Sequence, residues 1–132
     1  MPKFSKKSLE RLEQCHPDIQ RLMHEVIKYT DFTILCGHRD RREQEEAVAE
    51  GKSKVHFPNS RHNSLPSQAI DIAPYPIDWN DFQKFEELYR VVKKCAEFLD
   101  IPVRWGGDWN GNGDWRDEKF RDMPHYELKE QK

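Results

Sequence analysis

SRHNSLPSQAID, residues 60–71, joins a polar, turn-rich segment to a short apolar segment that contains a carboxylate. Asp71 lies within the run AIDIA at residues 69–73, which is typical of a short buried strand. Burial of a carboxylate is costly unless a cation pairs with it. His62 precedes Asp71 by nine positions, and His125 lies near the end of the sequence. These residues suggest that the cation is a metal ion.

The composition indicates one globular domain with a charge-rich surface. A chain of 132 residues has the usual length of one domain, and we assign residues 1–132 to a single domain. The net charge of -2 gives no general attraction to nucleic acid or to an anionic membrane. No apolar run approaches the roughly 20 residues of a membrane span. We therefore expect no nucleic-acid binding, no membrane insertion and a monomer.

The N-terminus and the cysteines indicate a protein made in a cytosol. The segment Met1–Lys7 is basic, but no apolar segment of a secretory signal follows it. Cys15, Cys36 and Cys95 are odd in number and have no CxxC spacing. We expect reduced, mostly structural thiols, and a thiol nucleophile is the less favoured alternative.

The order of the predicted elements indicates an α+β fold with a small, mostly antiparallel sheet and packed helices. Helical spacing of apolar residues and capping patterns predict helices over residues 5–16, 17–27, 40–51 and 80–99. β-Branched and aromatic residues predict strands over residues 32–36, 68–73, 101–105 and 124–128. A long polar loop is expected over residues 52–67.

Three candidate metal ligands stand out, namely His62, Asp71 and His125. Two imidazoles and one carboxylate leave a fourth position open, which is the pattern of a catalytic zinc site. Asp122 precedes His125 by three residues and is a candidate general base if this segment turns back towards the metal. Spacing alone leaves a second interpretation open, in which a loop satisfies His62 and Asp71 caps a turn.

A second polar loop partly matches a calcium-binding EF-hand loop. Side chains with oxygen ligands stand at alternate positions, namely Asp108, Asn110, Asn112 and Asp114. Gly113 stands at the sixth position, where an EF-hand loop has its glycine. Lys119 stands where an EF-hand has its bidentate glutamate. A weak calcium site and a glycine-rich surface hairpin are both consistent with this segment.

Several motifs together carry a family resemblance. They are Gly37-His38-Arg39 with Gln44, Ser60-Arg61-His62 with Ala69-Ile70-Asp71, the segment RWGGDW at residues 104–109 and the segment DMPHYEL at residues 122–128. In this combination the chain resembles the M15 family of zinc peptidases that act on bacterial cell walls. Within that family it looks most like the phage L-alanyl-D-glutamate peptidase endolysins, and the resemblance covers nearly the whole chain.

The resemblance implies a hedgehog/D-Ala-D-Ala-peptidase-like fold and a role for six of the motif residues. His62, Asp71 and His125 would bind zinc, and Asp122 would be the catalytic carboxylate. Arg39 would contact the substrate and help to stabilise the developing oxyanion, which agrees with the attraction between a cation and a polarised carbonyl. Ser60 would orient the ligand loop or bind the substrate. His56, the chief rival ligand, falls outside the family motif.

The resemblance also implies the activity. The expected reaction is hydrolysis of the L-alanyl-D-glutamate bond in peptidoglycan stem peptides by an endolysin, which acts on the cell wall in the periplasm after holin-mediated release from the host cytoplasm. A D-alanyl-D-alanine carboxypeptidase of the same family and a non-catalytic zinc-containing binding domain remain alternatives. The chain departs from the motif SxHxxGxAxD, because its glycine is missing and the spacing from His62 to Asp71 is longer. We expect the additional residues to bulge within the loop.

Overall fold

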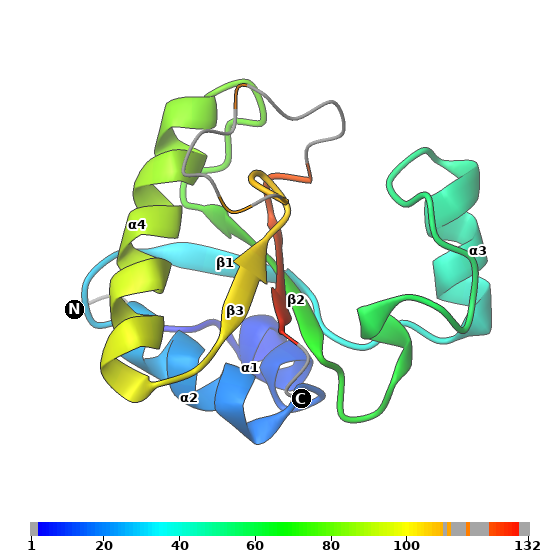
Figure 1. Ribbon diagram of the computed structural model, residues 1–132, viewed down its shortest axis with the longest axis horizontal. Helices are drawn as coiled ribbons and strands as arrows, with labels where there is room; N and C mark the ends of the chain where they lie inside the picture. The colour runs from blue at the N-terminus through cyan, green and yellow to red at the C-terminus, as the bar shows by residue number, and fades with distance from the viewer. Residues whose placement is uncertain (1–2, 110, 112–115, 117–121, 130–132) are drawn as a thin grey trace.

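The protein is described here by a computed structural model of residues 3–109, 111, 116 and 122–129. Its elements are, in order, α1 (Lys6–Leu12), α2 (Pro17–Val26), β1 (Phe32–Cys36), α3 (Arg41–Ala49), the 3-10 turn η1 (Arg61–Asn63), β2 (Ala69–Pro74), α4 (Phe82–Leu99), β3 (Val103–Trp105) and β4 (His125–Leu128). Figure 1 shows the sheet in the middle of the molecule, with α4 and α3 at opposite ends.

The strands form one antiparallel sheet with the order β1-β2-β4-β3, which confirms the predicted fold class. β2 lies inside the sheet between β1 and β4, so residues 69–73 are all buried. The register places Asp71 opposite Cys36 on β1 and opposite His125 on β4. Pairing of distant strands therefore brings His125 next to Asp71.

The apolar core lies between the sheet and the helices α1, α2 and α4. The predicted stripe on α2 is buried, namely Ile19, Leu22, Met23 and Val26. On α4 the buried residues are Phe85, Leu88, Val92, Cys95 and Ala96, whereas Phe82 at its N-terminal end is 36% exposed. Burial of each large aliphatic or aromatic side chain stabilises the fold by roughly 1.5–3 kcal/mol.

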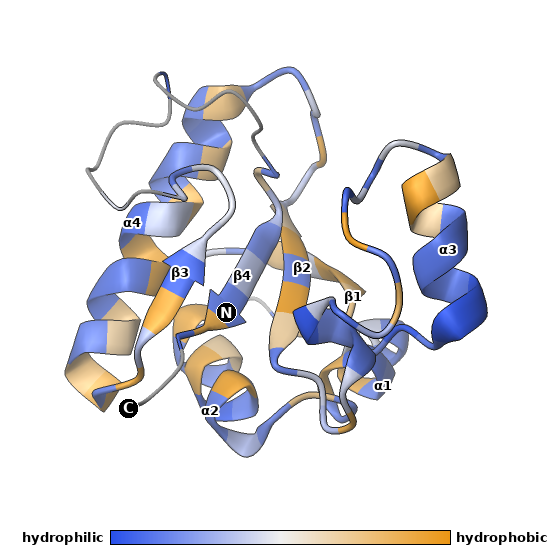
Figure 2. Ribbon diagram, turned by 45° about the vertical axis from the view of Figure 1, so that its right-hand side comes forward, coloured by the Kyte–Doolittle hydropathy of each residue, from blue (hydrophilic) through white to orange (hydrophobic). Residues whose placement is uncertain are grey.

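α3 lies outside this apolar core. Figure 2 shows that α3 is largely hydrophilic, whereas β2 in the sheet is largely hydrophobic. The predicted capping box is confirmed, because Asp40 Oδ1 accepts a hydrogen bond from Glu43 N at 2.8 Å. Gln44 is fully buried, and its Nε2 donates to Val55 O at 2.7 Å. Polar contacts therefore attach α3 to the segment that follows it.

Most predicted boundaries differ from the structure by one or more residues, and two of these differences have a clear physical reason. α1 ends at Leu12 rather than near His16. The chain leaves the helix there because Cys15 forms a bridge with Ser67 and His16 N donates to Ser67 O at 2.8 Å. β3 begins at Val103 instead of residue 101, which fits the missing N–H donor of the preceding proline.

Residues 60–71 contain one short turn that the sequence did not predict. Residues 61–63 form η1, and Ser60 caps it by accepting a hydrogen bond from His62 N at 3.2 Å. Residues 64–66 are exposed, with Leu65 at 70%, and the chain is buried again at Ser67. The additional residues therefore bulge outwards as expected, and both ends of the motif stay in the site.

The three cysteines are free thiols, and Cys15 and Cys95 are buried. Burial raises the pKa of Cys15 to about 12, so this thiol stays protonated at neutral pH. None of the helices in the described ranges combines the length and apolar character needed to cross a bilayer.

Candidate active site

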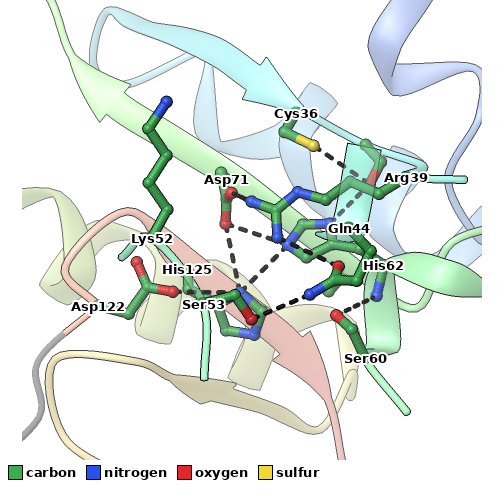
Figure 3. Close-up of polar contacts among 12 residues, drawn as sticks. Cys36, Arg39, Gln44, Lys52, Ser53, Ser60, His62, Asp71, Asp122 and His125 are labelled. Atoms are coloured by element: carbon green, nitrogen blue, oxygen red, sulfur yellow. Dashed lines mark hydrogen bonds and ion pairs between the residues drawn. The ribbon is translucent and has the colours of Figure 1, made fainter. Parts of the chain in front are cut away.

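The three predicted ligands converge at the centre of the sheet. His62 on η1, Asp71 on β2 and His125 on β4 point towards one another in Figure 3. His62 Nε2 lies 3.2 Å from Asp71 Oδ1 and 3.3 Å from His125 Nδ1. His125 Nδ1 lies 3.3 Å from Asp71 Oδ1. The three atoms therefore form a nearly equilateral triangle.

This triangle fits the coordination of zinc. Ligand atoms at ordinary zinc distances in a tetrahedral site are about 3.3–3.4 Å apart, and the three observed separations are 3.2–3.3 Å. The residues are only 1% (His62), 6% (Asp71) and 7% (His125) exposed. A buried set of two imidazoles and one carboxylate matches the donor types of a zinc site with an open position.

Each histidine is oriented by a second contact on its other ring nitrogen. His62 Nδ1 lies 2.6 Å from Gly37 O, which can only accept, so Nδ1 carries a proton. His125 Nε2 lies 2.8 Å from Glu127 Oε1 and donates to this carboxylate. Such outer contacts fix the ring orientation and leave the facing nitrogen available to a metal.

The three groups form a coupled ionic cluster in the metal-free protein. Burial alone would lower the pKa of His62, but the charge and hydrogen bond of Asp71 raise it to about 10. Burial would raise the pKa of Asp71, whereas the charge of His62 and the hydrogen bonds of both histidines hold it well below its usual value. The pKa of His125 is raised by its hydrogen bonds to Asp71 and Glu127 against the effect of burial. A cation therefore already balances Asp71 before any metal binds.

Asp122 lies beside the ligand triangle, as its predicted role requires. The chain turns back after residue 121, with His125 N donating to Asp122 O at 3.0 Å. Asp122 Oδ2 is then 3.8 Å from His125 Nδ1. Gly106 makes this approach possible, because a Cβ there would lie 2.4 Å from Asp122 O. Burial, followed by the charge of Asp71, raises the pKa of Asp122 to about 6.

Arg39 also lies in the cluster, where it contacts the side chain of Asp71. Its Nη2 donates to Asp71 Oδ2 at 2.9 Å, and its backbone N donates to His62 O at 2.8 Å. The neighbouring Arg42 is instead an exposed surface residue that pairs with Glu46.

The remaining predicted residues lie at the margin of the site or outside it. His56 is exposed and contacts Glu45 at 2.7 Å, so the rival ligand is not part of the triangle. Ser60 caps η1, which is the orienting role that the sequence analysis considered. Of the candidate calcium ligands, Asp108 is 3% exposed, and Asn110, Asn112 and Asp114 lie outside the described residues. The calcium site therefore stays a prediction.

Sequence reasoning gave no role in the site to three groups around the triangle, although Gln44 belongs to one of the motifs. Glu127 orients His125, and the only signal for it was that the two residues share a face of β4. Gln44 Oε1 accepts from Arg39 Nη1 at 3.5 Å, so this buried amide supports the arginine. Cys36 Sγ lies within 4.8 Å of ligand atoms of His62 and Asp71. Strand register placed it there, and the sequence indicated only a structural thiol.

Together the fold and this buried cluster define the class of small α+β peptidases. The chain matches the family described as phage L-alanyl-D-glutamate peptidase over residues 1–129. It is 34% identical over 134 residues to the L-alanyl-D-glutamate peptidase of Escherichia phage T5, with 96% of this chain and 97% of the relative covered. The chain therefore belongs to the phage L-alanyl-D-glutamate peptidase family.

A solved structure agrees with this assignment. The chain superposes on the crystal structure of the Serratia marcescens L-Ala D-Glu endopeptidase ChiX with a TM-score of 0.76 and 28% identity. The match covers 98% of this chain and 90% of that chain. The predicted family and the prediction of a peptidase are confirmed.

Proposed function

We propose that this protein is a zinc peptidase that hydrolyses the L-alanyl-D-glutamate bond in peptidoglycan stem peptides and serves as a phage endolysin in host lysis. The observation that carries the proposal is the convergence of His62 Nε2, Asp71 Oδ1 and His125 Nδ1 beside Asp122. In a chain of this family, such a cluster is best explained as a hydrolytic centre.

These three atoms would hold the zinc. When bound, zinc supplies a Lewis acid for the scissile carbonyl and lowers the pKa of a water molecule. Gly37 O and Glu127 Oε1 keep the two imidazole rings in the orientation that this binding requires.

Asp122 is the proposed general base and acid. With a pKa of about 6 its carboxylate is mainly ionised at neutral pH, so it accepts the proton of the attacking water. The same carboxyl group then delivers the proton to the leaving amine. Arg39 contributes positive charge where negative charge develops on the carbonyl oxygen. Ser60 lies at the pocket that contains His62 and His125, where its hydroxyl contacts the substrate in this proposal.

In this proposal the protein acts as a monomer on the cell wall, after holin-mediated release from the host cytoplasm. Digestion of purified peptidoglycan by the zinc-loaded protein, followed by mass spectrometry, tests the activity and the bond together. We expect stem peptides with a new N-terminal D-glutamate, and glycan chains that retain L-alanine. Release of terminal D-alanine from intact stem peptides would instead indicate a carboxypeptidase.

Asp122→Asn separates the enzyme from a non-catalytic zinc-containing domain. The variant is expected to bind zinc like the parent and to lose roughly 10²–10⁴-fold in rate, the usual contribution of a general acid–base residue. An unchanged rate would contradict the mechanism. A loss of zinc would instead make Asp122 a metal ligand, because it also lies within 4.8 Å of ligand atoms of Asp71 and His125.

A further inference from the structure

Two pockets meet at the catalytic cluster. One has a volume of about 450 Å³ and the other about 550 Å³. Arg39, Lys52 and Asp122 line both pockets, so the two adjoin at the proposed base. The two adjoining pockets therefore offer room for the two parts of a peptide whose scissile bond lies at Asp122.

The smaller pocket is strongly cationic. The described residues that line it include five cationic side chains, Arg39, Lys52, Lys54, Arg61 and Arg104, against two acidic ones, Asp122 and Glu127. His62 and His125 also line this pocket, which connects it directly to the ligand triangle. We call it the cationic pocket.

The larger pocket has balanced charge and an aromatic wall. Arg39 and Lys52 are matched by Asp71 and Asp122 among its described lining residues. Trp79 stacks on Phe85 with ring centroids 5.8 Å apart, and the Trp79 side chain is half exposed. Leu35 and Met123 complete the apolar surface of what we call the aromatic pocket.

The two sides of the proposed scissile bond also differ in charge, as the two pockets do. The L-alanyl side carries a methyl group. The D-glutamyl side carries two carboxyl groups, of which only one continues the peptide chain, so the other remains as a carboxylate close to the scissile nitrogen. A free carboxylate is best received by guanidinium groups in a partly buried site.

On the basis of the proposed function, we propose that the cationic pocket binds the free carboxylate of the D-glutamyl residue through Arg61, with Arg104 beside it, and that the aromatic pocket receives the L-alanyl side. The protein would thus select substrates in which this carboxylate is unmodified. This assignment fixes the direction of the stem peptide across the site.

Arg61 is the best-placed cation for this role. It directly precedes His62, its side chain is 27% exposed, and its Nη1 donates to Gln68 Oε1 at 2.7 Å. Its Nε lies 3.7 Å from Glu127 Oε2, the oxygen that also accepts from Arg104 Nη2 at 3.0 Å. Two guanidinium groups therefore share one carboxylate oxygen, so Arg61, Arg104 and Glu127 together keep a net positive charge. This charge lies close to His125, because Glu127 also contacts His125 Nε2.

A pair of substrates tests this inference. One peptide contains L-alanyl-D-glutamate with a free carboxylate, and the other has the same sequence with that carboxyl group converted to a carboxamide. We expect the zinc-loaded parent to favour the carboxylate in kcat/KM by roughly 10- to 100-fold, as expected for a charge-assisted hydrogen bond. Arg61→Gln should remove most of this preference, and Arg61→Lys should restore part of it.

Three further variants provide two controls and one independent test of the pocket. Trp79→Ala should lower kcat/KM for both peptides and keep their ratio. Arg21→Gln removes an exposed arginine from α2 and should change neither value. Lys54→Gln, an exposed change at the pocket rim, should reduce the preference by roughly two- to fivefold, and it tests the pocket independently if Arg61→Gln does not fold.

The outcomes distinguish this inference from the proposed function. Cleavage of both peptides at equal rates by the parent would overturn the inference and leave the proposed function standing. A preference that Arg61→Gln and Lys54→Gln both leave intact would also overturn it. Failure of the parent to cleave either peptide would overturn the proposed function itself.

Discussion

Asp71 divides its two carboxylate oxygens between Arg39 and the histidines. Oδ2 accepts a hydrogen bond from Arg39 Nη2 at 2.9 Å, while Oδ1 faces His62 and His125 (Figure 3). The side chains of Arg39 and Asp71 are only 14% and 9% exposed. The arginine thus neutralises and orients Asp71 without occupying the oxygen that would face the proposed metal.

This arrangement predicts that Arg39→Ala impairs catalysis far more than metal binding. We expect kcat/KM to fall by roughly 10²–10³-fold, as for the loss of an oxyanion donor, and zinc affinity to fall by roughly tenfold, at the lower end for the loss of an outer contact. Arg42→Ala is the matched control, since its side chain is exposed and paired with Glu46. Equal activity of the Arg39 and Arg42 variants would show that Arg39 has no role in catalysis.

The raised pKa of Asp122 predicts that the stability of the metal-free protein falls as the pH rises. Its pKa is about 6 when folded and close to 3.8 when unfolded, so ionisation of the native carboxyl group lowers stability as pH rises from about 4 through 6. Asp122→Asn should therefore stabilise the chelator-treated protein by about 1–3 kcal/mol at pH 7.5 and have little effect near pH 4. Urea unfolding at both pH values measures the difference, and the same effect at both would contradict the prediction.

The His62–Asp71 pair predicts that zinc binding releases a proton. In the metal-free protein the pKa of His62 is about 10, so this ion pair contributes its full stability below about pH 6.5 and loses it as pH rises through about 10. Zinc requires the neutral ring, so its affinity should rise up to about tenfold per pH unit across the neutral range. Competition with a chromophoric chelator at several pH values measures the slope. An affinity independent of pH would mean that His62 is already neutral.

Glu127 is predicted to support metal binding without contacting the metal. Glu127→Ala removes the 2.8 Å contact to His125 Nε2 and should weaken zinc binding by roughly 10- to 100-fold. Glu127→Gln keeps an acceptor oxygen and should have a smaller effect. Glu45→Ala, which removes the exposed partner of His56, is the control and should leave zinc affinity unchanged. A similar loss in both alanine variants would point to a general effect of charge.

Calcium binding by the loop that begins at Asp108 is tested by calorimetric titration of the metal-free protein. A weak site should give saturable heat at up to millimolar calcium, and Asp108→Asn should reduce it. The absence of heat at millimolar calcium would favour the glycine-rich hairpin.

The elements of this fold could be predicted because their signals are local. The capping box at Asp40, the apolar stripe of α2 and the β-branched run of β1 each lie within a few residues. The cluster of His62, Asp71 and His125 could also be predicted, because a carboxylate within an apolar strand requires a cation. The end of α1 was harder to predict from the sequence, because Cys15 leaves the helix to pair with Ser67, more than fifty residues away.

The sequence by itself determined which residues are the candidate metal ligands, through the chemistry of His62, Asp71 and His125. Only the tertiary structure decided how they are supported and what surrounds them. The contacts of Glu127 with His125, Arg39 with Asp71 and Arg61 with Glu127 depend on strand register and on the return of the chain at Gly106. Register is set by the packing of whole strands, so no local pattern could place two adjoining pockets of different charge at Asp122.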